Sequence, residues 1–242
     1  MKAEPTGFFD LKRRASAAFT LVELLVIVAI IGILAGLLLP ALSRAREKAR
    51  AARVQAELYG IGLALDMYSS DHDNKLPPVR VNCNSDLAAH WCELPVELAR
   101  GGYLPLGSQG GREANLEDIF NPQHTYKYAA PGPQLLNGAP GGNYSLWVPT
   151  SAPTDMSGSG KYFTDPKASP VRWVVWSLGP KPGSAKSQGT YAPLSSACWY
   201  HGAGDSGVII RYADQAGTQF HLSRRICERP FSNTPKRTIQ PT

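Results

Sequence analysis

The sequence predicts an α+β fold in which one long N-terminal helix packs on a small antiparallel β-sheet with long loops. An uninterrupted apolar run lies near the N-terminus, and helical periodicity continues beyond it. The remainder is rich in Gly, Pro, Ser and Asn, with short apolar or aromatic runs that are typical of strands between turns. The 242 residues, 43% of them apolar and 18% charged, suffice for one membrane segment and one globular domain.

The apolar run predicts a transmembrane helix over residues 19–42. Every residue from Leu24 to Leu39 is apolar or glycine, and with its flanks the run reaches the roughly 20 residues that cross a bilayer as a helix. A conventional secretory signal places its small-residue cleavage site after a shorter apolar core. Here the small residues 15–18 precede the core, so a cut there leaves the membrane segment on the mature protein, starting at Phe19.

The start of this run carries a specific motif. A basic leader meets the small residue Ala18, then Phe19, then an apolar stretch with a single carboxylate, Glu23. This pattern resembles the prepilin-type signal of type IV pilins and type II secretion pseudopilins. The resemblance implies a leader of residues 1–18, removal of that leader by prepilin peptidase between Ala18 and Phe19, and methylation of Phe19. Ala18 stands where the family usually has glycine, and it is small enough for the same pocket.

Glu23 and Pro40 are expected to act in assembly. A carboxylate is costly in hydrocarbon unless it is paired, protonated or near the headgroups. The resemblance implies that Glu23 pairs with the free α-amino group of Phe19 on a neighbouring subunit, because a buried charge needs an opposite charge. Pro40 matches a proline of many pilins, and proline kinks a helix. Residues 32–40 therefore bend or partly melt in a filament, or form a small-residue contact face through their two glycines.

Helical spacing over residues 43–70 predicts an amphipathic continuation of the helix into a domain formed by residues 71–242. Its buried face is expected to contain Val54, Leu58, Ile61, Leu65 and Tyr68. The helix is expected to end near Ser70, ahead of acidic residues and two prolines, and residues 63–77 resemble the same stretch of the major type II pseudopilin. The basic residues that follow the apolar run predict a collar beside anionic lipid headgroups, so no nucleic acid partner is expected.

In the domain, strands are expected at residues 144–148, 171–178 and 207–212, with long loops over residues 100–145 and 150–170. The strand that ends at Ser177-Leu178-Gly179 resembles the last-strand region of major pseudopilins, which enters an acidic calcium-binding loop. Here the next residues offer Lys181 and Lys186 and no carboxylate, whereas calcium needs several oxygen ligands. We therefore expect no metal and no cofactor.

Four cysteines in a domain that is expected to be exported predict disulfides, and they allow three pairings. The favoured pairs are Cys83–Cys92 and Cys198–Cys227, because each closes a local loop; the alternative is four reduced, buried thiols. The segments Asp71–Asp73 and His201–Gly207 carry acid–base residues, but no G-x-S-x-G, C-x-x-C or H-x-x-x-H spacing occurs. No catalytic residue is expected, and the chain is not expected to be an enzyme.

The sequence thus predicts a structural subunit of a type II secretion pseudopilus or a type IV pilus-like filament. Basic residues flank the apolar run at both ends, so the distribution of charge does not decide which end faces the cytoplasm. The expected orientation comes from the resemblance, which implies a single-pass inner-membrane protein with a periplasmic or extracellular domain. Its expected partners are other pilin or pseudopilin subunits, prepilin peptidase, an inner-membrane assembly platform and membrane lipid. The alternatives are an anchored binding module that displays residues 79–242 for ligand or surface recognition, and an anchored enzyme.

Processing provides a direct test. Because Ala18 fits a small-residue pocket and the apolar core lies downstream, the mature protein is expected to begin at Phe19. Mass spectrometry of the N-terminus of the purified protein measures this. An intact leader, or a cut after residue 40, would contradict the prepilin-type interpretation.

Overall fold

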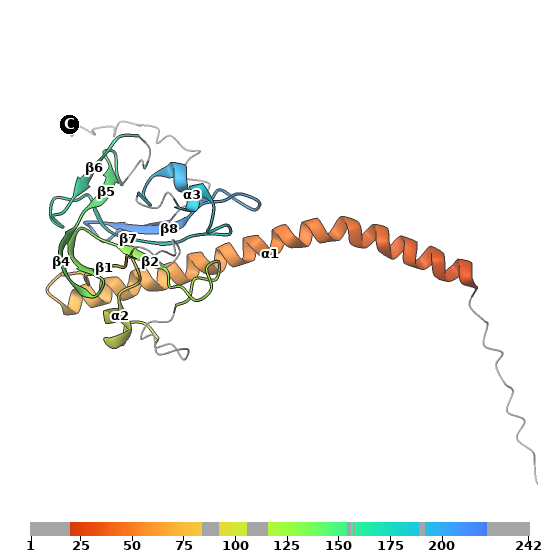
Figure 1. Ribbon diagram of the computed structural model, residues 1–242, viewed down its shortest axis with the longest axis horizontal. Coiled ribbons are helices and arrows are strands. Elements are labelled where there is room, and N and C mark those ends of the chain that lie inside the picture. The colour runs from red at the N-terminus through yellow and green to blue at the C-terminus, as the bar shows by residue number, and fades with distance from the viewer. Residues whose placement is uncertain are drawn as a thin grey trace, which may run out of the picture. The chain divides into compact units, whose positions relative to one another are not determined.

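The computed structural model describes residues 20–83, 92–105, 116–153, 156, 158–188 and 192–221. The chain divides into two compact units, Met1–Ser43 and Arg44–Thr242. One helix, α1 (Leu21–Asp71), runs through 51 residues and contributes to both units, as Figure 1 shows. The single long helix that the sequence predicts is confirmed, and its start and end lie within two residues of the expected ones.

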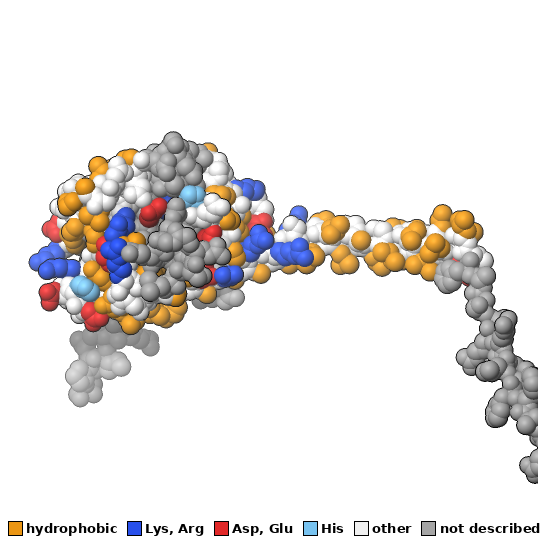
Figure 2. Space-filling view, turned by 60° about the horizontal axis from the view of Figure 1, so that its bottom comes forward, with side chains coloured by type: hydrophobic (Ala, Val, Ile, Leu, Met, Phe, Trp, Pro, Cys, Tyr) orange, Lys and Arg blue, Asp and Glu red, His pale blue; other side chains and the backbone are white. Residues whose placement is uncertain are grey.

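The described part of the first unit is the apolar beginning of α1. Its large apolar side chains are exposed, from Leu21 at 80% to Leu42 at 46%, which a helix in water would not tolerate. Figure 2 shows apolar side chains along this stretch of α1 and a group of Lys and Arg side chains after it. By length and composition this helix can cross a membrane.

In the second unit, α1 buries the face that its periodicity predicts. Val54, Leu58, Ile61 and Leu65 have no exposed surface, and Tyr68 is half-buried against the same core. Gly62 lies on this face, where an added Cβ would come within 2.7 Å of Trp173 and 2.6 Å of Gln219. Glycine in a helix costs about 1 kcal/mol relative to alanine, and here it allows the sheet to approach closely.

The sheet consists mainly of antiparallel strands. One set has the order β2-β7-β8-β9 and the other the order β1-β3-β4, in which β1 and β3 are parallel. Strands β5 and β6 form a separate antiparallel pair. The strands are β1 (Val79–Val81), β2 (Lys127–Ala129), β3 (Gly132–Leu136), β4 (Ala139–Tyr144), β5 (Leu146–Pro149), β6 (Gly160–Phe163), β7 (Val171–Ser177), β8 (Ile209–Asp214) and β9 (Gln219–His221). Among its described residues, the domain also contains the short helices α2 (Val96–Arg100), α3 (Ala185–Gln188) and η1 (Ser196–Cys198).

The expected strands are found as β5, β7 and β8, but the expected loops over residues 100–145 and 150–170 are in part strands. Strands β2, β3 and β4 lie within the first loop, and β6 lies within the second. The β3–β4 hairpin turns at Asn137-Gly138, where both residues have positive φ, 49° and 84°. Asn-Gly is the strongest two-residue hairpin signal. The sequence interpretation missed it because the flanking strand is built of Gly, Pro and Asn.

The core lies between α1 and the sheet and continues on the other side of the sheet. Trp173, Trp176, Tyr126 and Tyr128 are its largest fully buried side chains. These two tryptophans therefore pack between elements. Such aromatic residues each bury a large area and dominate the energetics of a core.

Two leucines of α1 provide a matched test of this packing. Leu58 is fully buried and Leu63 is 43% exposed. Leu58→Ala is expected to lower the free energy of unfolding by about 2–5 kcal/mol, because it leaves a cavity against the sheet. Leu63→Ala is expected to change it by less than about 1 kcal/mol. Denaturant titration of the full chain in detergent, followed by tryptophan fluorescence, measures both; equal effects would contradict the assigned face.

Candidate functional site: the N-terminal helix and its attachment to the domain

Thr20 and Glu23 cap the start of α1 through reciprocal hydrogen bonds. The Thr20 backbone N–H and hydroxyl donate to Oε2 of Glu23 at 2.9 and 2.7 Å, and the Glu23 N–H donates back to the Thr20 hydroxyl at 3.2 Å. This is a capping box, which satisfies backbone donors that a helix start leaves free. The spacing Thr-x-x-Glu is visible in the sequence, yet the sequence interpretation treated Glu23 as a carboxylate without a partner in its own chain.

The capping box leaves part of Glu23 available. Both bonds go to Oε2, and Oε1 makes no hydrogen bond with any described residue. A carboxylate has about four lone-pair sites, so it can cap the helix and still accept a cation. The processing residues Ala18 and Phe19 lie outside the described residues.

Pro40 lies inside α1, and the helix is assigned without a break on either side of it. Gly36 and Gly32 lie about one and two turns before it, and a Cβ added at either would meet nothing within 4 Å. Within the described residues this stretch of α1 therefore has no packing partner. The predicted bending or melting in a filament remains a prediction.

The far part of α1 is fastened to the sheet through Asp66. Its carboxylate accepts from Trp173 Nε1 on β7 at 3.3 Å and from Gln219 Nε2 on β9 at 2.8 Å. The Arg172 guanidinium lies 3.7 Å from it and donates to the hydroxyl of Ser69. Two strands are thus tied to one helical turn, and charge-assisted bonds of this kind are each worth about 1.5–3 kcal/mol.

Two further carboxylates of α1 hold loops of the domain. Glu57 accepts from Arg53 at 2.7 Å and from the hydroxyl of Tyr126. Glu47 accepts from the hydroxyl of Tyr200 and from the backbone N–H of Gly204, both at 3.0 Å. Burial, followed by the bond to Glu47, raises the pKa of Tyr200 to about 12, so its hydroxyl stays a donor at neutral pH. The i,i+4 pair Arg53–Glu57 follows from helical spacing. The contacts with Tyr126, Tyr200 and Gly204 do not, because these partners are distant in sequence from α1.

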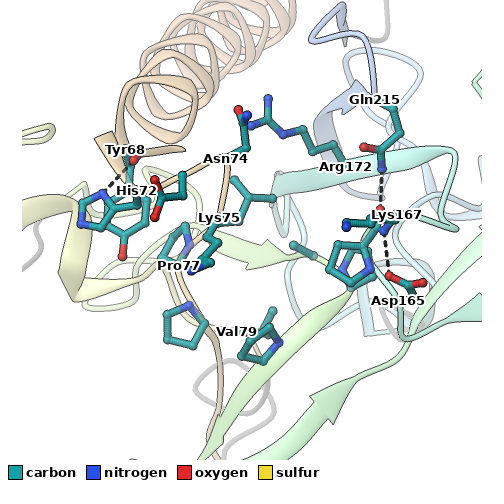
Figure 3. Close-up of a pocket in the computed structure, with 17 residues that line it drawn as sticks. Tyr68, His72, Asn74, Lys75, Pro77, Val79, Asp165, Lys167, Arg172 and Gln215 are labelled. Carbon is teal, nitrogen blue, oxygen red and sulfur yellow. Dashed lines mark hydrogen bonds between the residues drawn. The ribbon is translucent and has the colours of Figure 1, made fainter. Parts of the chain in front are cut away.

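A pocket of about 810 Å³ lies where α1 ends, between the segment that leads into β1 and the loops before β3 and β7. Its apolar wall consists largely of prolines: Pro77, Pro78, Pro131, Pro133 and Pro166. Figure 3 shows Lys75 and Lys167 on opposite sides of the cavity. Neither ammonium group forms a hydrogen bond or ion pair with another described residue.

The predicted disulfides receive no support from the described cysteines. Cys83 is exposed and Cys92 is buried, and the two remain separate thiols, so the predicted Cys83–Cys92 bond is not formed. The Cys92 thiol instead points to the hydroxyl of Tyr144 at 3.4 Å, and burial raises its pKa to about 11. Cys227 lies outside the described residues, so the Cys198–Cys227 prediction is not tested.

The two segments with acid–base residues differ in their contacts. In the segment His201–Gly207 the His201 ring lies 3.3 Å from Asp205, whereas Asp71 and His72 of the segment Asp71–Asp73 contact aromatic side chains. His72 stacks on Tyr68 and its Nδ1 lies 2.8 Å from the Tyr68 carbonyl, while neighbouring Asp71 accepts from Tyr103. Within the described ranges, no three His, Cys, Asp or Glu side chains lie close enough to hold a metal ion. A buried carboxylate, Asp118, accepts from Ser177, Phe120 and Leu178 and supports a turn beside β7.

The comparison with known proteins concerns the same N-terminal region. A model of the prokaryotic N-terminal methylation motif matches residues 13–39. The chain has a prepilin-type N-terminus. That motif contains Ala18, Phe19 and Glu23 and ends just before Pro40.

Part of the chain is similar in sequence to type II secretion proteins. It is 37% identical over 62 residues to the type II secretion system core protein G of Pseudomonas aeruginosa, covering 26% of this chain and 44% of that protein. It is 32% identical over 83 residues to the protein of the same name from Escherichia coli K12, covering 28% of this chain and 57% of that protein. The chain thus spans about half the length of these relatives. No solved structure gives a significant match.

Proposed function

We propose that this chain is a structural subunit of a type II secretion pseudopilus or a type IV pilus-like filament. The observation that carries the proposal is the methylation motif over residues 13–39, which coincides with the apolar start of α1. Prepilin peptidase cuts between Ala18 and Phe19, and the new N-terminal Phe19 is methylated. The role is mechanical, and no catalytic step is assigned to the domain.

In the membrane the subunit spans the bilayer once, with its domain in the periplasm or outside the cell. The exposed apolar side chains from Leu21 to Leu42 face lipid before assembly and neighbouring helices afterwards. Basic residues between Arg44 and Arg53 meet anionic headgroups, each worth about 1 kcal/mol near such a surface. The partners of the membrane-bound subunit are an inner-membrane assembly platform and other pilin or pseudopilin subunits.

The described surface of α1 supports packing beyond the bilayer as well. Tyr59, Leu63 and Met67 follow each other at four-residue steps and are 48%, 43% and 57% exposed. They form one partly exposed stripe along α1. At one end of the stripe the Arg211 guanidinium of β8 lies over the Tyr59 ring, 4.8 Å from its centroid. An apolar stripe that continues from a membrane helix fits burial against the same helix of a neighbouring subunit.

The role of Glu23 in filaments is tested by two substitutions. Glu23→Val is expected to insert and to be processed normally, yet to lower incorporation into filaments at least about tenfold, because the α-amino group of a neighbouring Phe19 loses its partner. Thr20→Ala is the control, since it removes the capping box at a cost of about 1 kcal/mol and keeps the carboxylate. Crosslinking of each variant beside the wild type measures co-assembly.

The control separates two explanations of a defect. Retained assembly of Thr20→Ala with loss for Glu23→Val supports pairing between subunits. Equal loss in both variants assigns the role of Glu23 to capping, and normal assembly of Glu23→Val removes Glu23 from docking altogether.

The pocket at the end of α1 favours a second function, an anchored binding module. Its volume lies in the range of ligand sites, and rigid proline walls need little reorganisation on binding. Most of the wall is apolar, and its three cationic side chains, Lys75, Lys167 and Arg172, outnumber its two carboxylates, Asp73 and Asp165. The fitting ligand therefore has an apolar body and one carboxylate. A ligand with such a carboxylate is either a small organic acid or an extended peptide that contains an acidic residue.

This second function is tested with 3-phenylpropionate and its uncharged amide, by NMR titration of the full chain in nanodiscs. The acid is expected to bind at millimolar concentration or tighter, and the amide at least about tenfold more weakly, because the amide cannot pair with Lys75 and Lys167. An N-acetylated Pro-Glu-Phe peptide amide tests the peptide source. Double substitution of Lys75 and Lys167 by methionine is expected to abolish the preference for the acid, and no binding of either probe refutes the module.

A further inference from the structure

Two loops of the domain meet beside α1 and are joined by lysine side chains. Lys186 in α3 donates through Nζ to Oδ2 of Asp205 at 2.9 Å. Lys181, in the segment between β7 and α3, donates through Nζ to the carbonyl of Gly204, also at 2.9 Å. Both ammonium groups therefore come from the segment that follows β7, and both acceptors lie in the turn over residues 200–206.

The same turn is fastened to α1 on its other side. The Gly204 N–H donates to Glu47 of α1, while the Gly204 carbonyl accepts from Lys181. This single residue therefore connects α1 with the segment after β7. Tyr200, at the start of the turn, donates to the same Glu47 oxygen. Gly204 has a φ of 93°, which a residue with a side chain rarely adopts, so the turn needs a glycine here.

Asp205 is the electrostatic centre of the turn. It accepts from the backbone N–H groups of His201 and Ser206 at 3.0 and 2.8 Å, and the His201 ring lies 3.3 Å away. Burial acts to raise the pKa of Asp205, but the bonds from Lys186 and these N–H groups outweigh it and lower the pKa well below its usual value. The carboxylate is therefore ionised at neutral pH and accepts from the Lys186 ammonium group.

The donor set of this region does not fit calcium. The strand β7 ends in the residues that resemble the entry to a calcium-binding loop, and calcium takes six to eight oxygen ligands, several of them carboxylates. Here Asp205 is the carboxylate that accepts from the segment after β7, and Lys186 already pairs with it. No acidic cluster of metal-binding size exists among the described residues.

We infer that Lys181 and Lys186 act as built-in cations that hold the turn over residues 200–206 against α1, so that the closure of this region needs no divalent metal ion. The inference concerns the domain alone and holds whether or not the chain enters a filament. The pair Lys186–Asp205 retains 26% and 34% of its side-chain exposure, a degree at which an isolated ion pair contributes little. Its strength here comes from the shared network, in which one turn accepts two ammonium groups and also contacts Glu47.

The test measures opening of the turn directly. Hydrogen–deuterium exchange of the Gly204 amide, in the full mature chain in nanodiscs, reports the loss of its bond to Glu47. Lys186→Met keeps the aliphatic stem and removes the charge, and it is expected to speed this exchange about tenfold. Lys186→Arg is expected to keep exchange near the wild-type rate, because it restores a cation that can reach a carboxylate.

The matched control is Lys167→Met, which removes an exposed ammonium group without an ion pair and is expected to leave Gly204 exchange unchanged. Replacing 1 mM EDTA by 1 mM calcium chloride is expected to change neither the exchange nor the melting temperature of the wild type by more than about 1 °C. Slower exchange or a melting temperature several degrees higher in calcium would overturn the inference. Unchanged exchange in Lys186→Met would overturn it as well.

Discussion

The structure depends on burial of one face of α1 against the sheet. Val54, Leu58, Ile61 and Leu65 are completely removed from solvent, and fully burying such a side chain is worth about 1.5–3 kcal/mol. Gly62 lies within this face and permits the close approach of Trp173. Most helical stability in proteins comes from packing of an apolar face, so burial against the sheet fixes the position of the second half of α1.

Polar contacts then determine which surface of α1 meets which part of the domain. Hydrophobic burial is non-directional and tolerates sliding of a helix on a sheet. Asp66, Glu57 and Glu47 remove that freedom, because each carboxylate accepts from groups that come from other elements. Since these three anchors lie along α1, a force applied along the helix reaches the domain at several points rather than at one.

The sequence predicts the helical half of this protein well and the rest only in outline. The apolar run, the buried face and the end of α1 follow from local periodicity and from the Asp and Pro residues beyond it. The β3–β4 hairpin was missed because its strands lack apolar alternation, although Asn137-Gly138 marks the turn. Contacts such as Tyr200–Glu47 join residues 153 positions apart, and no local pattern encodes them.

The residues of the candidate site were likewise predicted only in part from the sequence. Glu23 was recognised from a motif, and its capping partner Thr20 was present in the same four residues. The cysteine prediction failed for Cys83–Cys92 because closeness in sequence does not bring side chains together; the buried thiol points to Tyr144 instead.

The limited extent of the sequence similarity to core protein G can be explained by the different physical constraints on α1 and on the domain. The matched stretches cover 26% and 28% of this chain, close to the length of the N-terminal motif and α1 together. In the proposed filament subunit, residues of the membrane helix face constraints from the bilayer, the peptidase and the neighbouring helices at once. The sequence of the domain needs only to preserve its hydrophobic core and its contacts with Asp66, Glu57 and Glu47 of α1. In the arrangement that we infer, one of these contacts, that of the turn over residues 200–206, is held by the ammonium groups of Lys181 and Lys186. A domain with that freedom can lose sequence similarity while the helix that carries it cannot.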